Sequence, residues 1–240
     1  MPLLAGEGAG PLRRAAGFLV AFVLFAILAV LVLGIAYRFV PPVSTLMLGR
    51  WATLRPVERI TVPLDGIAPS LPMAVVASED ARFCAHRGVD WGALREVIDD
   101  AEDDAPSRGA STIPMQTAKN IFLWPGRSYV RKALELPIAL YIDLLWGKRR
   151  VMEAYLNVAE WGDGVFGAEA AARHHFGKSA RNLTRGEAAL LATALPNPRV
   201  RNPSRPTARH RALANRLLAR MEAGAGLRGC LQPTRSAARN

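Results

Sequence analysis

Residues 79–90 read EDARFCAHRGVD, and two more polar blocks follow, GASTIPMQTAKN at 109–120 and RSYVRKALE at 127–135. An apolar stretch, SLPMAVVAS at 70–78, leads into the first block. Its composition predicts a helix that Ser70 caps, with Pro72 in the first turn. The acids, cations and hydroxyls of the three blocks are the candidates for chemistry, and the segments around them decide the fold.

Helical signals dominate the chain after residue 70. Thr184 and Glu187 form a T-x-x-E capping box, and Pro196 ends the helix that follows it. Neither an internal repeat nor an alternating βαβ pattern is present, so the fold class is predicted to be mainly α. The Pro-rich residues 38–72 are predicted to be an extended connector with a short strand at 59–62. The further predicted helices are 117–122, 129–146, 148–158, 168–176, 184–195 and 207–223.

Two glutamates stand out as candidate catalytic groups. On a helix, Glu79 shares a face with Val75, Val76 and Phe83, whose apolar side chains disfavour a charged carboxylate and favour a general base. A surface glutamate is the alternative interpretation of Glu79 considered alone. Glu135 lies one turn after Arg131, which by itself predicts an i,i+4 ion pair.

A cluster of cations surrounds the second and third blocks. Lys119, Arg127, Arg131 and Lys132 fall within 14 residues of one another, beside a polar Ser-Thr-Gln loop. Such a cluster suits a doubly charged phosphate group. Two carboxylates with a cation cluster indicate glycosyl transfer from a phosphorylated donor, in which a base deprotonates the acceptor and the cations stabilise the departing diphosphate.

These blocks closely resemble the glycosyltransferase domain of peptidoglycan polymerases, the transglycosylase half of class A penicillin-binding proteins. The resemblance runs from about residue 59 to 220. Neither S-x-x-K nor K-T-G occurs, so the chain resembles the stand-alone form, the monofunctional biosynthetic peptidoglycan transglycosylases. The motifs that carry it are ED-x-x-F-x-x-H-x-G-x-D at 79–90, G-x-S-T-I-x-x-Q-x-x-K-N at 109–120, R-K-x-x-E at 131–135, E-x-Y-L-N at 153–157 and E-A-A-L-L-A-x-x-L-P at 187–196.

The resemblance implies a lysozyme-like fold in two lobes that polymerises lipid II. Glu79 would deprotonate the 4-hydroxyl of the acceptor lipid II, which attacks the growing chain with inversion and releases undecaprenyl pyrophosphate. Glu135 would assist the leaving diphosphate directly or through a cation. No cofactor and no protein metal site are implied, and a divalent cation, Mg²⁺ or Mn²⁺, at the donor pyrophosphate is left open. The implied substrate-binding residues are Asp80, His86, Ser111, Thr112, Gln116, Lys119, Asn120, Arg127, Arg131 and Lys132.

This sequence departs from the family pattern at a few positions. Met115 stands where the family has the first Gln of a pair, and Ala110 replaces a Gly before the Ser-Thr dipeptide. We therefore carry over Gln116 and not Met115. Pro137 follows Glu135 closely and frees the carbonyl of Ala133, which predicts a kink in that helix.

Residues 15–37 contain neither a charge nor a proline and would span roughly 34 Å as a helix, enough to cross a bilayer. A cleaved signal peptide would have a shorter apolar region and a small-residue cleavage site. We predict an uncleaved transmembrane helix after a short cytoplasmic N-terminus at 1–14, then a connector at 38–58, the glycosyltransferase domain at 59–223 and a basic tail at 224–240. The flanking Arg residues do not decide the orientation; the implied function places the domain in the periplasm, anchored once in the bacterial inner membrane.

The composition limits the other classes of function. The 240 residues carry a net charge of +11, but residues 196–240 alone hold ten Arg, no Lys and one acid. A uniformly basic nucleic-acid protein is therefore not indicated.

Two alternative functions stay open: a wall-degrading muramidase, and a membrane-anchored module whose Arg-rich tail binds nucleic acid or anionic lipid. The expected partners are lipid II, the growing glycan, the membrane and the cell-wall synthesis machinery; the two cysteines allow at most one disulfide, for which their spacing does not argue.

Overall fold

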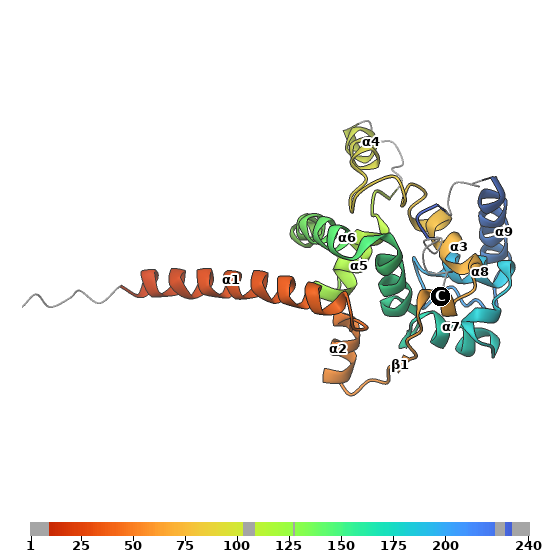
Figure 1. The fold of residues 1–240 in the computed structure, drawn as a ribbon, viewed down its shortest axis with the longest axis horizontal. Coiled ribbons are helices and arrows are strands. Elements are labelled where there is room, and N and C mark those ends of the chain that lie inside the picture. The colour runs from red at the N-terminus through yellow and green to blue at the C-terminus, as the bar shows by residue number, and fades with distance from the viewer. Residues whose placement is uncertain (1–9, 103–108, 127, 224–228, 232–240) are drawn as a thin grey trace, which may run out of the picture.

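The computed structural model describes residues 10–102, 109–126, 128–223 and 229–231. In this part of the chain the fold is mainly helical, as predicted. A long helix, α1, projects from a domain in which α3 and α7–α9 gather at one end, whereas α4, α5 and the start of α6 lie nearer the other (Figure 1). The helices are α1 Pro11–Tyr37, α2 Thr45–Ala52, α3 Ser70–Glu79, α4 Trp91–Glu102, α5 Ile113–Phe122, α6 Tyr129–Val158, α7 Ala168–Phe176, α8 Arg185–Ala194 and α9 Ala208–Ala223.

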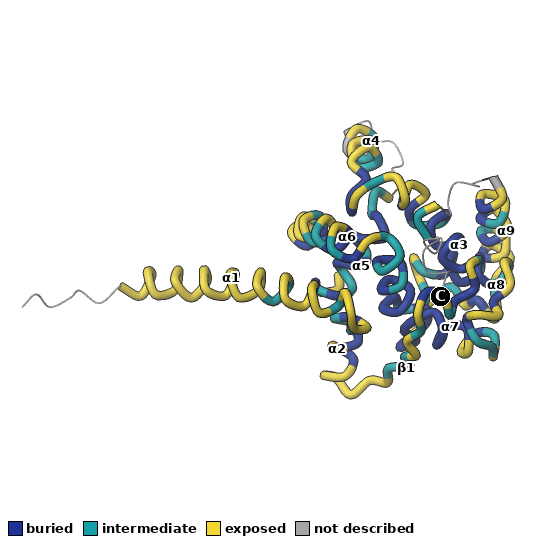
Figure 2. Tube along the Cα trace, viewed as in Figure 1, coloured by how far each residue is buried: buried dark blue, intermediate teal, exposed yellow. Residues whose placement is uncertain are grey.

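Helix α3 is buried in the core and ends at the first polar block. All residues from Leu71 to Ala77 are buried, and the helix packs against α8 and α9 (Figure 2). A helix that is apolar on all sides must be surrounded by protein. The predicted Ser70 cap is wrong, because Pro69 precedes the helix and Ser70 is its first residue. The first carboxylate after this buried stretch is that of Glu79, which is half-buried.

Helices α5 and α6 pack side by side and carry the second and third blocks. The side chain of Thr112 accepts a hydrogen bond from Met115 N and starts α5, whereas Ser128 caps α6 in the same way through Arg131 N. Gly147 has φ 72° and divides α6 into two helices, as the separate predictions for 129–146 and 148–158 require. Pro137 lies within the first of these two helices. The residue of α6 with non-helical backbone angles is Gly147, and not a neighbour of Pro137, where the kink was predicted.

A small three-stranded sheet closes one side of the domain. Strand β3 (Val165–Phe166) lies between β1 (Glu58–Arg59), to which it is parallel, and β2 (Glu160–Gly162), to which it is antiparallel. The predicted strand at 59–62 is therefore largely wrong, because pairing ends at Arg59. Val62 instead bonds to a side chain: its N–H donates to Asn157 Oδ1 at 3.0 Å, and its carbonyl accepts from Asn157 Nδ2 at 2.9 Å.

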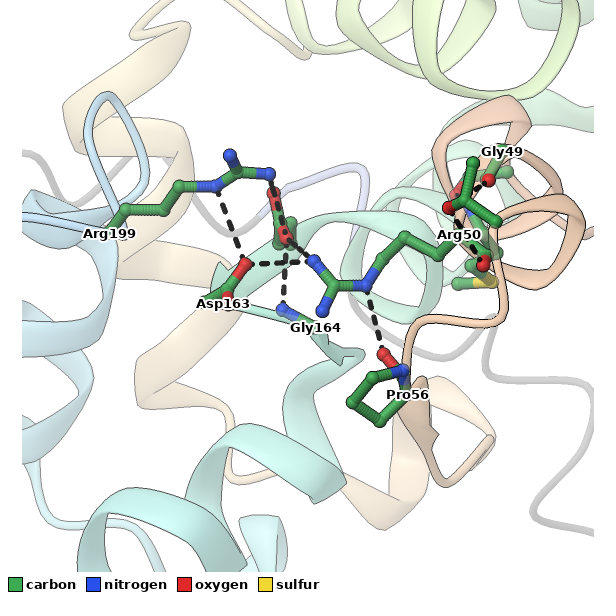
Figure 3. A network of polar contacts seen from close by, with 10 residues as sticks. Gly49, Arg50, Pro56, Asp163, Gly164 and Arg199 are labelled. Atoms are coloured by element: carbon green, nitrogen blue, oxygen red, sulfur yellow. Dashed lines mark hydrogen bonds and ion pairs between the residues drawn. The ribbon is translucent and has the colours of Figure 1, made fainter.

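Helix α2 interrupts the segment that was predicted to be extended. Ser44 caps it by accepting from Met47 N at 3.1 Å. Figure 3 shows how its Arg50 is held: Nη1 pairs with Asp163 Oδ1 at 2.8 Å, and Nε donates to the carbonyl of Pro56 at 2.9 Å. The buried guanidinium thus ties α2 to the turn between β2 and β3, and this pairing lowers the pKa of Asp163. These tertiary contacts stabilise a helix in a segment whose prolines favoured the prediction of an extended connector.

Helix α4 was also absent from the predictions. Asp90 begins it by accepting a hydrogen bond from Ala93 N at 3.0 Å. The same carboxylate accepts from Arg82 Nε at 2.7 Å, and these bonds, the one from Arg82 first, lower the pKa of Asp90 to about 2. Because one side chain both caps α4 and pairs with Arg82, Asp90 fixes the shape of the loop that follows Glu79.

Helix α9 has one face in the core. Leu217 and Met221 are buried, and Arg209, Arg216 and Arg220 are exposed. The apolar face of this helix is therefore covered by the domain and is not free to enter a membrane. This favours the core-packed interpretation of residues 207–223 over the membrane-binding module.

Helix α1 is exposed along most of its length but contacts α6 near its C-terminal end (Figure 2). Trp146 Nε1 donates to the carbonyl of Gly34 at 2.7 Å, and the Tyr141 hydroxyl donates to the carbonyl of Leu31 at 2.7 Å. A side chain at Gly34 would collide with the ring of Tyr141. Among the described residues, α1 is the one helix that is long and apolar enough to cross a membrane.

Cys84 and Cys230 form a disulfide, although their spacing gave no argument for one. Cys84 lies in the loop between Glu79 and α4, and Cys230 lies beyond α9. The bond therefore attaches the C-terminal segment to the loop that begins at the candidate base.

We expect the double variant Cys84→Ser/Cys230→Ser to be less stable than the wild type by about 2–5 kcal/mol, because the disulfide joins positions 146 residues apart. Thermal melting in detergent, with and without dithiothreitol, measures this. The reductant should lower the melting temperature of the wild type to that of the variant and leave the variant unchanged. Equal melting temperatures in all four samples would contradict the prediction.

Candidate active site

Glu79 is the last residue of α3 and is half-buried. Each of its carboxylate oxygens accepts one hydrogen bond: Oε1 from Ser78 Oγ at 3.0 Å and Oε2 from Gln116 Nε2 at 3.2 Å. A carboxylate oxygen can accept more than one bond. Both oxygens thus keep acceptor capacity for a hydroxyl proton while the carboxylate is held in a defined orientation.

Helix α5 turns its polar residues toward one side. Gln116, Lys119 and Asn120 are three and four residues apart and therefore share a helical face. Met115 is 1% exposed and packed in the core. The apolar residue that departs from the family pattern is accordingly a core residue here, and Gln116 is the one that meets Glu79.

Asp80 and His86, both predicted to bind substrate, bond to each other and to the start of α5. His86 Nε2 lies 3.0 Å from each oxygen of Asp80, and Asp80 Oδ2 accepts the backbone N–H of Ile113 at 2.9 Å. Asp80 is buried. Ile113 is the first residue of α5, where a carboxylate stabilises the free N–H groups of the helix. The pair therefore anchors the start of α5 beside Glu79.

The Ser-Thr dipeptide divides between two roles. Thr112 is buried, caps α5 and donates its hydroxyl to the carbonyl of Gly88 at 2.6 Å. Ser111 is half-buried, and its hydroxyl accepts from Lys132 Nζ at 2.6 Å. Thr112 thus bonds to the backbone around the start of α5, whereas Ser111 belongs to the cation cluster.

Glu135 is 2% exposed and lies between two cations. Its Oε1 pairs with Arg131, and its Oε2 accepts from Lys132 Nζ at 2.9 Å. The expected i,i+4 pair with Arg131 is present, and Lys132 extends it to Ser111. Since both carboxylate oxygens are occupied and buried, Glu135 positions cations.

Lys119 faces the same region without an ion pair to any described carboxylate. Burial lowers the pKa of Lys119; the charge of Glu135 opposes this, and the charges of Arg131 and Lys132 add to it. A desolvated ammonium among other cations is costly to the free protein. An anion bound next to it would relieve that cost.

Two cavities flank the contact between Glu79 and Gln116. One of about 570 Å³ lies between Glu79, the Gly109–Thr112 loop and α4. The other, of about 200 Å³, is lined by Gln116, Lys119 and Asn120 on one side and by Tyr155 and Glu160 on the other. The base thus lies beside one space, and the polar face of α5 lines a second.

Some of the predicted site cannot be placed. Arg127 lies outside the described residues. Within the described residues, no three side chains of His, Cys, Asp or Glu are arranged to hold a metal ion. The described residues therefore offer no such ligand set.

Two residues of the site were not predicted. Tyr155 belongs to the E-x-Y-L-N motif but was given no role, and its hydroxyl donates to Gln116 Oε1 at 3.0 Å. Glu160 lines the smaller cavity and is paired with Arg50 at 3.6 Å and Arg199 at 3.3 Å. Only the tertiary structure brings Glu160 to the cavity, whereas the motif already pointed to Tyr155.

Comparison with known proteins places this arrangement in a family. Residues 47–222 match the family model described as Transglycosylase. Proteins named biosynthetic peptidoglycan transglycosylase are similar over most of the chain. One from Rhodopseudomonas palustris is 53% identical and covers 90% of this chain and 92% of the relative, one from Rhizobium meliloti is 53% identical over 86% and 90%, and one from Brucella suis is 56% identical over 77% and 83%. The chain that carries Glu79, Gln116 and the buried Glu135 cluster therefore belongs to the transglycosylase family.

Proposed function

We propose that this chain is a peptidoglycan glycan-chain polymerase. It transfers the lipid-linked growing chain onto the 4-hydroxyl of lipid II, with inversion and release of undecaprenyl pyrophosphate. The observation that carries the proposal is the arrangement of a half-buried carboxylate, Glu79, next to the cation-bearing face of α5. That arrangement combines a base for a sugar hydroxyl with positive charge for a leaving diphosphate.

Glu79 is the general base of the proposed reaction. It takes the proton of the acceptor 4-hydroxyl as that oxygen bonds to the anomeric carbon of the donor. The bond from this carbon to the diphosphate oxygen breaks on the opposite face, so the configuration inverts. Ser78 and Gln116 keep the carboxylate facing the acceptor.

The cations act on the leaving group. Lys119, Arg131 and Lys132 lie in the region where negative charge grows as the diphosphate departs, and such fixed charges lower the barrier. Glu135 works through Arg131 and Lys132, because both of its oxygens are occupied by them. Arg127 is proposed to join this group on the strength of the family motif.

The muramidase alternative lacks support from the cation cluster. A hydrolase of finished glycan has no diphosphate to stabilise, and it would gain nothing from a desolvated lysine beside two further cations. The similar proteins also carry the word biosynthetic in their names. Synthesis therefore accounts for features that degradation leaves without a purpose.

The experiment that tests the proposal incubates the detergent-solubilised full chain with labelled lipid II. We expect glycan polymer and free undecaprenyl pyrophosphate in matched amounts. A parallel incubation with purified cell wall should release no sugar fragments. Fragments from the wall, with lipid II left unused, would overturn the proposal and favour the muramidase.

We further propose that α1 crosses the bacterial inner membrane, with the catalytic domain in the periplasm. The proposed divisions of the chain remain those expected from the sequence, namely 1–14, 15–37, 38–58, 59–223 and 224–240. The Cys84–Cys230 disulfide supports this orientation, because disulfides persist in oxidising compartments such as the periplasm and are rare in the cytosol. The argument from the disulfide does not depend on the implied function, from which the orientation was first predicted.

Protease added to spheroplasts is expected to degrade residues 60–230, because the proposed topology exposes them. A cytoplasmic protein in the same cells should stay intact until the membrane is lysed. Immunoblotting with antibodies to both proteins provides the measurement. Survival of the domain until lysis would reverse the proposed topology.

A further inference from the structure

We propose that Tyr155 is a positioning residue for the general base and acts on Glu79 through the side-chain amide of Gln116. The proposal rests on the assignment of Glu79 under the proposed function and adds a residue to it. Neither the cation cluster nor the family motif assigns this role to Tyr155.

Three helices contribute one residue each to a continuous chain of hydrogen bonds. The hydroxyl of Tyr155 on α6 donates to Gln116 Oε1 on α5 at 3.0 Å. Gln116 Nε2 then donates to Glu79 Oε2 at the end of α3, at 3.2 Å. The tyrosine hydroxyl therefore reaches the carboxylate through a single intervening amide.

The hydroxyl of Tyr155 is committed to this contact. Tyr155 is 1% exposed, and Gln116 Oε1 is the partner that the described residues offer to its hydroxyl. Burial raises the pKa of Tyr155 well above its usual value, and the negative charges of Glu79 and Asp80 add to this. The phenol therefore keeps its proton and stays a donor at any pH at which the protein works.

A fixed donor matters because an amide has two unlike ends. Gln can turn its side-chain amide by half a rotation, which would present the carbonyl oxygen to Glu79 and place two acceptors against each other. The Tyr155 hydroxyl favours the orientation in which the NH₂ group faces the carboxylate. Replacing it by hydrogen removes that preference and leaves the base without a reliable partner.

The expected consequence is kinetic and depends on pH. A hydrogen bond donated to a carboxylate stabilises its charged form, so loss of the donor should be visible in the pH dependence of turnover. Lys119 and Tyr155 interact electrostatically with this carboxylate. The other ionisable groups around the cavity beside Glu79 are Asp80, Arg82, Asp90, Glu96 and Asp100. They remain in Tyr155→Phe, apart from the phenol, which does not ionise in the working range.

Tyr155→Phe keeps the aromatic ring and its packing and removes only the hydroxyl. We expect kcat to fall about 10-fold, KM for lipid II to change less than about 2-fold, and the acidic limb of the pH profile of kcat/KM to move to higher pH. Tyr129→Phe is the matched control, because Tyr129 is on the same helix and is 96% exposed. It should behave as the wild type.

A double-mutant cycle tests whether Tyr155 acts through Gln116. Adding Tyr155→Phe to Gln116→Leu should cause no further loss, because the route from the hydroxyl to Glu79 is already broken. Additive losses would overturn the proposal, as would Tyr155→Phe with a lowered melting temperature but unchanged kcat and pH profile. If wild-type protein fails to polymerise lipid II, the proposed function fails instead, and the two failures are distinguishable.

Discussion

Replacement of Glu79 by Gln is expected to slow glycan polymerisation by about 10²–10⁴-fold, the usual contribution of a general base. Gln is nearly the same size and can still accept the hydroxyl of Ser78, which bonds to Glu79 Oε1 at 3.0 Å in the wild type. It cannot take a proton from the acceptor sugar. Initial rates with labelled lipid II measure the loss, and thermal melting should show that the fold is intact.

Glu222→Gln is a suitable control for this substitution. Glu222 is an exposed carboxylate on α9, paired with Arg185 at 3.3 Å and remote from the two cavities. Glu222→Gln makes the same chemical change away from these cavities, so the turnover of this variant should match that of the wild type. Full polymer yield from Glu79→Gln would remove Glu79 from the role of base.

Lys119→Met is expected to lower turnover by about 10²–10³-fold and to leave the protein as stable as before or more so. Burial lowers the pKa of Lys119, so the charged lysine opposes folding at neutral pH. The unfavourable contribution is present below the folded-state pKa and disappears as the pH rises above the unfolded-state value. The methionine side chain removes this unfavourable contribution. It also removes the positive charge that would interact with the leaving diphosphate. Turnover of lipid II and melting temperature, measured on the same sample, test both statements.

Lys178→Met should give the opposite pair of results. Lys178 pairs with Glu187 at 2.8 Å on the far side of the domain, and such surface pairs contribute about 0–1 kcal/mol. Its loss should lower the melting temperature slightly and leave turnover unchanged. If Lys119→Met behaves like Lys178→Met, the lysine is structural and the donor site lies elsewhere.

Local signals in the sequence predicted the helices that carry their own caps and breaks. The capping box at Thr184 and Glu187 is present, and Gly147 divides α6 where two helices were predicted. Helices α2 and α4 were not predicted, because each depends on a side-chain contact outside the helix. Arg50 of α2 needs Asp163, and the Asp90 cap of α4 is fixed by Arg82.

The sequence motifs list residues of the candidate site but not the contacts that these residues make. The motifs named Asp80, His86 and Thr112, but no spacing rule indicates that these three side chains bond to the protein itself. The path from Tyr155 to Gln116 spans 39 positions in the sequence and exists only once α5 packs on α6. A hydrogen bond between distant residues leaves no periodic signature.

The contacts between α1 and α6 fix the orientation of the domain toward the proposed membrane. Trp146 and Tyr141 bond to carbonyl oxygens in the last two turns of α1, and Gly34 leaves no space in which the helix could rotate past the ring. A flexible tether would let the domain tumble, and most encounters with a lipid would occur in the wrong orientation. If α1 is held rigidly in the proposed membrane, lipids that diffuse in the plane of the bilayer would always meet the same face of the domain. The search for substrate would be two-dimensional, and the tilt of α1 would set the height of the cavity beside Lys119 above the lipids.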